Sequence, residues 1–251
     1  MFARKRYSVL PSRGQLRYIE RNMPPPGRKM RKYMWRDIFR AICYVVKTGC
    51  QWHLLPACYP PCGSVRHHFR SWSARGWLSE VLKKLVEKRR REIGKPVPHV
   101  GVIDSRSVRS ARCDSEKGVD GGKKVKGIKR HIVTDSNGYP LGIHVAKANV
   151  SDRNALIPMA TGLREDFPSV KRIKADNGYS GPVGKEPASH YNMELRCVRS
   201  NYGTSAFVPL DGRWVVERTF PWLDSYRRIC CNYEKTLESA TAMTVMACWP
   251  A

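Results

Sequence analysis

The sequence of 251 residues contains no long hydrophobic run and few acidic residues. No stretch approaches the roughly 18 consecutive apolar residues of a membrane-spanning helix, and the basic residues 1–14 lack the apolar centre of a signal peptide. We therefore expect no membrane partner and a cytoplasmic location. Asp and Glu number 21 against 46 Lys and Arg, which gives a net charge of +25. This excess favours a nucleic-acid partner over an anionic membrane, because no basic amphipathic stretch with a clean apolar face stands out.

The nine cysteines are an odd number, which is typical of free thiols in a reducing compartment. Cys58 and Cys62, followed by His67 and His68, offer an alternative as a zinc site. Their spacing is irregular, however, and the pattern favours ordinary buried or surface cysteines.

Residues 1–98 form the first of two compositional regions, and we predict that they are a small helical domain of the helix-turn-helix type that binds DNA. Residues 1–47 contain thirteen Lys and Arg but only two acids. Helical spacing predicts a helix that ends at Gly49. One face of this helix carries Trp35, Ile38, Ile42, Val45 and Val46. Ser64 is the expected N-cap of a later helix. The alternative is a helical cap whose charged face is only solvated.

Residues 99–251 form the second region, where strand patterns begin. Short apolar runs around 99–104 and 170–176 each end at an acid, and 129–148 is typical of a hairpin with its turn at Asp135–Gly138. Helical spacing is found over 152–167, another short strand over 193–200, and a helix over 213–234. The order predicts an α/β fold with one mixed sheet and flanking helices.

Two acids end predicted strands, and a third lies on a predicted helix. Asp104 follows Val102-Ile103, and Asp176 follows Ile173-Lys174-Ala175. If the two strands are neighbours, their ends bring both carboxylates together, and a divalent cation relieves the repulsion between them. Glu217 then completes a site for two Mg²⁺ ions, with Mn²⁺ as a substitute. Taken alone, Asp104 and Asp176 can also be interpreted as turn formers at strand ends. Glu217 can be interpreted as a helix-surface residue that pairs with Arg213, four positions earlier.

Several ordered segments resemble one known family. They are GCQWHLLP, VIDSRSV, GKKVKGIKRHIVTDSNG, DRNA, ADNGYSG, RWVVERTFPWL and YRRICCNYE. In this order they resemble the DDE transposases of bacterial insertion sequences, in the insertion sequence five family. The resemblance implies a ribonuclease H-like catalytic domain, with Asp104, Asp176 and Glu217 as catalytic and metal-binding residues. The short intervals between these acids leave room only for a core without a large inserted domain.

The resemblance implies Mg²⁺-dependent cleavage of DNA at the ends of an insertion sequence, followed by transfer of the strands to target DNA. Double-stranded DNA and a second copy of the chain on that DNA are the expected partners, at the bacterial nucleoid. Two alternatives remain: a non-catalytic DNA-binding remnant of a transposase, and a ribonuclease H-like nuclease without strand transfer.

A set of basic residues near the predicted site is expected to contact DNA phosphates. Its members are Lys123, Lys124, Lys126, Lys129, Arg130, Arg213 and Arg218. The alternative for the lysine-rich stretch is a solvated sheet edge. Asp120, Asp135 and Asp152 are interpreted instead as a loop residue, a hairpin-turn residue and a helix N-cap.

The sequence departs from the family pattern around Glu217. Leu210 and Asp224 stand where the wider family has a tyrosine and a lysine. Pro221, four residues after Glu217, should bend the helix, because its ring clashes with the Glu217 carbonyl. Together with a C-terminus at which the family normally continues a helix, these departures suggest a truncated or decaying copy.

Overall fold

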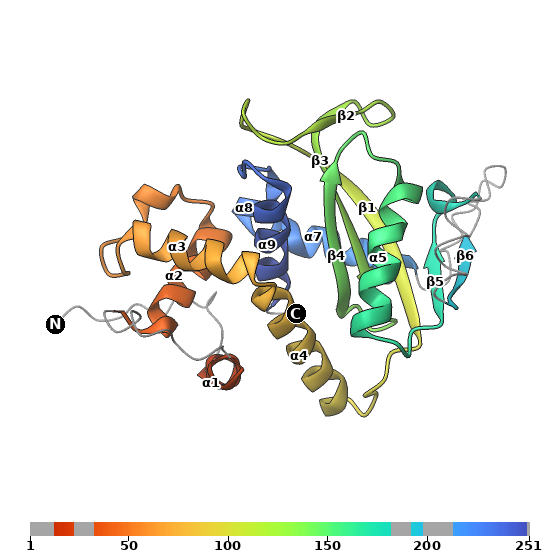
Figure 1. Ribbon diagram of the computed structural model, residues 1–251, viewed down its shortest axis with the longest axis horizontal. Helices are drawn as coiled ribbons and strands as arrows, with labels where there is room; N and C mark the ends of the chain where they lie inside the picture. The colour runs from red at the N-terminus through yellow and green to blue at the C-terminus, as the bar shows by residue number, and fades with distance from the viewer. Residues whose placement is uncertain (1–12, 23–32, 182–191, 198–212, 250–251) are drawn as a thin grey trace.

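The computed structural model describes residues 13–22, 33–181, 192–197 and 213–249. Helices come first and a mixture of strands and helices follows (Figure 1), but the helix predicted over 213–234 is divided into two helices that end at Asp224 and Cys230. No helix within these ranges is long and apolar enough to cross a membrane. The elements are α1 (Arg13–Arg21), α2 (Trp35–Thr48), η1 (Trp52–Leu54), α3 (Cys62–Ala74), α4 (Trp77–Glu92), β1 (Val100–Arg109), β2 (Gly118–Asp120), β3 (Val125–Thr134), β4 (Pro140–Lys147), α5 (Asp152–Asp166), β5 (Arg172–Ala175), η2 (Asn177–Tyr179), β6 (Glu194–Cys197), α7 (Arg213–Asp224), α8 (Arg227–Cys230) and α9 (Leu237–Cys248).

The regular elements described before β1 are all helical, and loops join them. Helix α2 buries Ile38, Ile42 and Val45 and ends at Gly49, whose φ of 69° lets its N–H bond to the Val45 carbonyl. The prediction for Ser64 was wrong. Helix α3 begins two residues earlier, after Pro61, so Ser64 lies inside its first turn.

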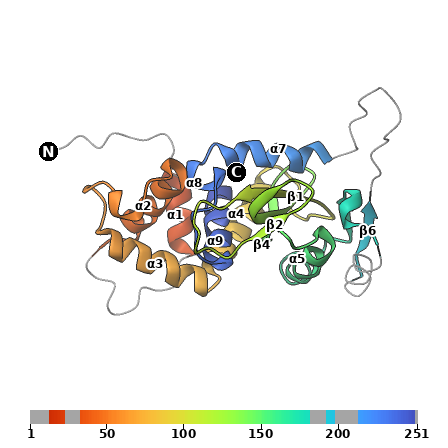
Figure 2. The same cartoon turned by 90° about the horizontal axis from the view of Figure 1, so that it is seen from above.

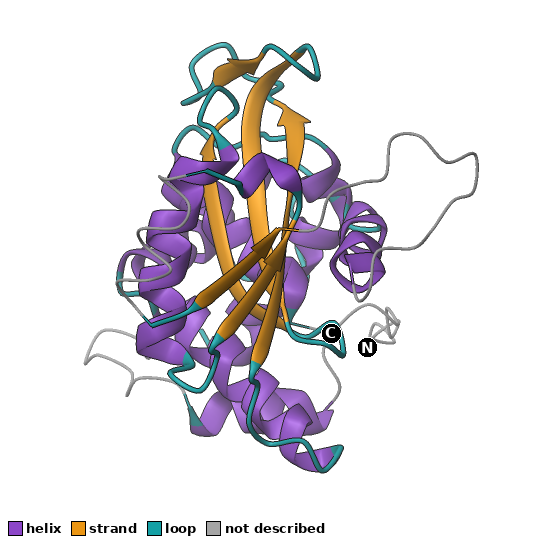
Figure 3. Ribbon diagram, turned by 90° about the vertical axis from the view of Figure 1, so that its right-hand side faces the viewer, coloured by secondary structure: helices purple, strands orange, loops and turns teal. Residues whose placement is uncertain are grey.

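The sheet runs in the order β4–β3–β1–β5–β6, and β2 pairs with the first residues of β3. Strand β3 is antiparallel to both β1 and β4, whereas β5 is parallel to both β1 and β6. Three antiparallel strands followed by two strands parallel to the first is the order of a ribonuclease H-like sheet. In Figure 3 the strands fan across one another, as expected from sheet twist. The predicted mixed α/β fold is confirmed.

Helices cover both faces of the sheet, with α5 and α7 on opposite sides (Figure 2). Side chains alternate between the faces along β1. Ser105 hydrogen-bonds to the first residue of α5, whereas Arg106 forms an ion pair with the last residue of α7. Even-numbered residues of β1, including Asp104, therefore lie on the face that α7 covers.

Helix α9 lies between the first hundred residues and the sheet (Figure 1). It packs on β4 and on α2, α3 and α4, and the Trp249 ring that follows it stacks on Phe39 at 4.9 Å between centroids. The buried Arg90 of α4 also pairs with the buried Asp135 of the β3–β4 turn. The apolar core is therefore continuous across residue 98, and the predicted division of the chain into 1–98 and 99–251 stays a prediction.

Candidate active site

Asp104 and Asp176 stand at the same level of two adjacent parallel strands. Val100 pairs with Arg172 and Val102 pairs with Lys174, so the offset between the paired residues is constant. The same offset, continued two residues beyond the last pair, brings Asp104 level with Asp176. Each carboxylate accepts a local backbone N–H, from Ser105 at 2.8 Å and from Gly178 at 3.0 Å. The predicted strand end at Asp104 was wrong, because β1 continues past it to Arg109, whereas Asp176 does directly follow the last residue of β5. The proximity of the two carboxylates stays a prediction.

The buried Tyr179 lies close to both of these acids. Its side chain has no exposed surface, and its hydroxyl lies 3.0 Å from His131 Nδ1. Burial raises the pKa of Tyr179 well above its ordinary value, and the nearby charges of Asp152, Asp104 and Asp176 raise it further. Tyr179 therefore stays protonated, and its buried side chain anchors the turn that begins at Asp176.

Asp152 belongs to this cluster, which the sequence analysis missed. The predicted N-cap role was wrong by one residue: the Ser151 hydroxyl caps α5 by accepting the Asn154 N–H. Asp152 Oδ1 instead accepts the Ser105 hydroxyl at 2.9 Å and pairs with Lys129 Nζ at 3.2 Å. No local sequence signal marks this role, because Asp152 stands at a helix start where an acid is ordinary.

Gly178 lies close to two of these carboxylates, which leave little space for a side chain. A Cβ atom at this position would lie 3.0 Å from both Asp152 Oδ2 and Asp176 Oδ1. Two atoms that each lie 3.0 Å from this point are at most about 6 Å apart, so the two carboxylates flank Gly178 closely. Glycine keeps this small space open, and oxygen-rich spaces of this kind suit a hard divalent cation.

Lys129 and Arg130 do not fit the predicted role of phosphate contacts. Their side chains are only 8% and 4% exposed. Lys129 pairs with Asp152, and Arg130 donates to the Ile229 carbonyl at 2.6 Å. Burial lowers the Arg130 pKa to about 10, although the nearby Asp224 charge raises it. Successive side chains of β3 point to opposite faces of the sheet, and Lys129 and Arg130 are both buried because both faces are covered. The exposed cations in this stretch are Lys123, Lys124 and Lys126.

Glu217 lies on the exposed side of α7, which packs on β1 and β3. Asp224, seven residues later, pairs with Arg106 of β1 at 2.5 Å. Seven residues make nearly two helical turns, so Glu217 and Asp224 project from the same side of α7. Arg106 and Asp104 share one face of the sheet, and Glu217 therefore projects along the face that carries Asp104.

The other predicted residues of α7 are only partly described. Arg218 is exposed, and its guanidinium lies 4.9 Å from the centroid of the Trp214 ring. The Arg213 side chain and Leu210 lie outside the described residues. Helix α7 continues through Pro221 to Asp224, and the predicted bend stays a prediction.

The donor types at this site suit Mg²⁺ or Mn²⁺, since carboxylate oxygens are the ligands that hard cations prefer. Across residues 13–22, 33–181, 192–197 and 213–249, however, no group of three or more His, Cys, Asp or Glu side chains forms a metal-binding cluster. Asp104, Asp176 and Glu217, all within these ranges, therefore do not form a complete set of metal ligands in this structure. The same finding disfavours a zinc site at Cys58, Cys62, His67 and His68.

Two family descriptions match consecutive parts of the chain. Residues 12–82 match "Putative transposase of IS4/5 family", and residues 95–189 match "Transposase DDE domain". Together they span most of the sequence. These two parts of the chain are thus similar to transposases, the first to those of the IS4/5 family and the second to a transposase DDE domain. The second match includes Asp104 and Asp176 and ends before Glu217.

A curated relative agrees with this family. The chain is 31% identical over 131 residues to "Putative transposase for insertion sequence element IS402" of Burkholderia cepacia. The aligned part covers 49% of this chain and 61% of that protein. The chain therefore aligns with less than two thirds of its relative's length.

Two solved transposase structures are more distant. The catalytic domain of Mos1 mariner transposase is 12% identical, with 67% of this chain and 88% of that chain covered and a TM-score of 0.31. The "Mos1 mariner paired end complex with Mn" is also 12% identical, with 75% and 68% covered and a TM-score of 0.26. These scores are too low to carry an argument about function.

Proposed function

We propose that this DDE transposase cleaves DNA at the ends of its insertion sequence and joins the freed strands to target DNA. The observation that carries the proposal is the parallel register of β1 with β5, whose constant offset, continued two residues, aligns Asp104 within β1 with Asp176 just after β5. Glu217, on the helix that packs over β1, supplies the third carboxylate. In this proposal the three acids hold two Mg²⁺ ions, for which Mn²⁺ can substitute.

Bound divalent ions would activate a water molecule and neutralise charge at the leaving 3′ oxygen. The residues of the chain have simpler tasks. Asp104 presents its oxygens from the middle of β1 and Asp176 from the residue after β5, while Tyr179 fixes the turn that holds Asp176. The exposed cations of the β2–β3 hairpin and Arg218 of α7 contact the phosphates on either side of the bond that breaks.

The chemistry requires no covalent bond between protein and DNA. Tyr179 is buried with a raised pKa, which makes it unsuitable as a nucleophile. Burial likewise raises the pKa of Tyr226 to about 12. We therefore assign attack first to water and then to the freed 3′-OH. Because two ends are cut and joined together, we expect a dimer or larger assembly on DNA, at the bacterial nucleoid.

The test is a reaction of the full chain with a labelled linear DNA that carries both ends of the element, together with a supercoiled target plasmid. Mg²⁺-dependent cuts at the ends, followed by joining to the plasmid, are the expected result. Cuts without joined products would indicate a nuclease without strand transfer. Binding of the ends with no cuts in Mg²⁺ or Mn²⁺ would indicate a non-catalytic remnant, and either outcome overturns the proposal.

A further inference from the structure

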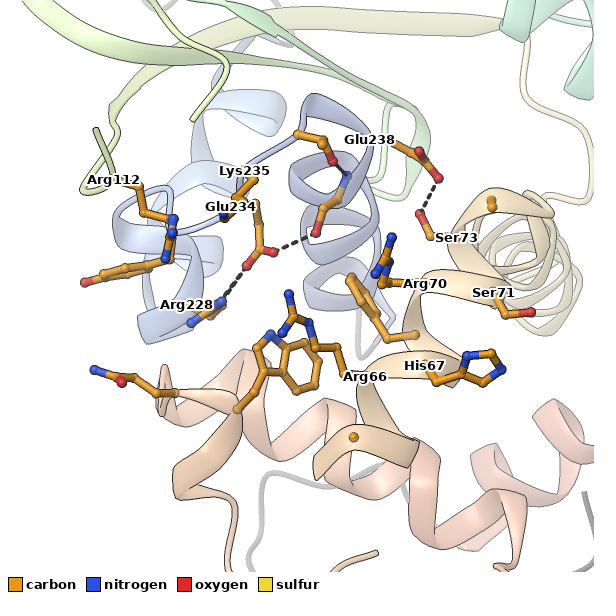
Figure 4. A pocket seen from close by; sticks show the side chains of 18 of the residues that line it. Arg66, His67, Arg70, Ser71, Ser73, Arg112, Arg228, Glu234, Lys235 and Glu238 are labelled. Carbon is orange, nitrogen blue, oxygen red and sulfur yellow. Dashed lines mark hydrogen bonds and ion pairs between the residues drawn. The ribbon is translucent and has the colours of Figure 1, made fainter. Parts of the chain in front are cut away.

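A cavity of about 1200 Å³ lies between the helical region and the C-terminal helices, away from the carboxylates. Helix α3 forms one wall, and the segment 228–239 forms the other (Figure 4). Arg112, three residues after the end of β1, also lines it. Strand β1 carries the chain roughly 17 Å from Asp104 to its last residue. A ligand here lies outside the candidate active site.

Most charged side chains of this cavity are neutralised within the protein. Arg228 forms two bonds with Glu234, at 2.9 and 2.6 Å, and Ser239 donates to the same carboxylate. Arg112 and Lys235 both pair with Asp114. These ion pairs leave little net charge on the C-terminal wall.

The α3 wall differs, because Arg66 and Arg70 have no ion pair in the described part of the chain. Both side chains are exposed, and their spacing of four residues places them one turn apart on the same side of α3. Figure 4 shows them rising toward the segment 228–239. Two like charges one helical turn apart repel each other weakly, and an anion beside them would relieve this repulsion.

The shape and composition of the groove match a nucleic-acid strand. Guanidinium groups bind phosphates through paired N–H donors. Tyr233, with 40% of its surface exposed, and the half-buried Trp52 offer aromatic surface at the same cavity. Gly63, on the α3 wall, has no atom within 4 Å of the position of a Cβ, so the groove is open there. Cations that track a backbone beside aromatic rings are typical of proteins that bind DNA strands.

We propose that this groove binds the phosphodiester backbone of the DNA end, with Arg66 and Arg70 as its phosphate contacts. The proposal rests on the proposed transposase function and names where that DNA is held outside the active site. An acidic segment of a partner protein is the other anion that such a groove could take, and it is an outcome of the test.

The test measures anisotropy of a fluorescein-labelled duplex of the terminal repeat with the full chain, in EDTA and over a range of salt concentrations. The variant Arg66→Gln/Arg70→Gln is compared with Arg66→Lys/Arg70→Lys, which keeps the charge, and with Arg89→Gln/Arg91→Gln on α4. Thermal melting confirms that each variant is folded. For the Gln pair we expect affinity lower by about tenfold or more, and a log–log salt slope smaller in magnitude by about 1.8. The Lys pair should keep the slope, and the α4 pair should resemble the original protein.

An unchanged slope and affinity in the Gln pair would overturn the groove proposal while leaving the transposase function intact. If the Gln pair still bound DNA but no longer bound poly-glutamate, the groove would be a site for an acidic partner protein. That result would also overturn the groove proposal. Absence of DNA binding by the original protein would overturn both proposals. If the original protein did not cleave the DNA but the Gln pair showed the expected change in slope, only the proposed cleavage and joining chemistry would be overturned.

Discussion

Asp104 and Asp176 are separated in the sequence by the same interval that separates each residue of β1 from its partner on β5. The coincidence places two acids side by side at one level of the sheet. Such a pair is costly for a fold without a compensating cation, because like charges at one point repel each other. The proposed metal site rests on this register.

Replacement of either acid by its amide should abolish the chemistry and spare the fold. Asp104→Asn and Asp176→Asn keep the side-chain volume and can still accept the local backbone N–H. We expect end cleavage to fall by more than about a hundredfold, since even groups that only orient a metal ligand contribute 10–100-fold. DNA binding should stay nearly constant. Asp166→Asn, at the exposed end of α5, is the control. Cleavage near the original rate would remove that acid from the site.

Gly178→Ala should impair the site through a single methyl group. The new Cβ would approach Asp152 Oδ2 and Asp176 Oδ1 to 3.0 Å, so a carboxylate must shift by a few tenths of an ångström. Since catalytic groups tolerate only about half an ångström of misplacement, we expect cleavage to fall by about tenfold. Gly162→Ala in α5, where a Cβ meets nothing within 4 Å, should leave cleavage unchanged and stabilise the fold by about 0.5–1 kcal/mol. Equal cleavage by the two variants would show that the Gly178 space is irrelevant.

His131 should make stability fall in mild acid. Burial lowers its pKa to about 3, and His144 and Lys129 lower it further, whereas Asp152 opposes the shift. The folded state therefore keeps His131 neutral while the unfolded chain takes up a proton below its ordinary pKa of about 6.5. Stability is fully present above pH 6.5 and is lost as the pH falls toward 3.

Urea unfolding between pH 6 and pH 4 measures this loss. We expect the free energy of unfolding to fall more steeply in the original protein than in His131→Asn, by up to about 1.4 kcal/mol per pH unit. His53→Asn, at an exposed position, should follow the original curve. Parallel curves for His131→Asn and the original protein would contradict the assignment.

Pro221→Ala should stabilise α7 and its Glu217. The helix continues through an exposed Pro221, whose ring removes the N–H that the Glu217 carbonyl would accept. We expect the free energy of unfolding to rise by about 1–3 kcal/mol and cleavage to rise with it, if the proline impairs the original copy. Lower activity at unchanged stability would show instead that the proline belongs to the working geometry.

Local patterns predicted much of this structure. The stop at Gly49 and the turn at Asp135 are confirmed, since each depends on the chemistry of a few adjacent residues. The pairing of the strands that carry Asp104 and Asp176 was also predictable, but the predicted end of the first strand at Asp104 was wrong, because β3 pairs with β1 as far as Arg109. The start of α3 was not predictable, since Ser64 has the chemistry of a cap but Pro61 occupies that position.

The other predictions that were wrong depend on contacts between residues far apart in the sequence. Lys129 and Arg130 resemble an exposed basic edge in sequence, but Asp152 at the start of α5 and the Ile229 carbonyl of α8 are their partners. Asp152 joins the site only because β1 passes beside the start of α5, where Ser105 meets it. The docking of α9 against α4 likewise depends on residues that are far apart in the sequence. None of these contacts leaves a local trace in the sequence.

The central claim is that Asp104, Asp176 and Glu217 together hold the divalent ions. Its most direct test is to count Mn²⁺ ions by electron paramagnetic resonance on the full chain bound to a terminal-repeat duplex. We expect two tightly bound ions for the original protein and for Asp166→Asn, and at least one fewer for each of Asp104→Asn, Asp176→Asn and Glu217→Gln. If all of these proteins bound the same number of ions with the same affinity, the three carboxylates would not be the metal ligands.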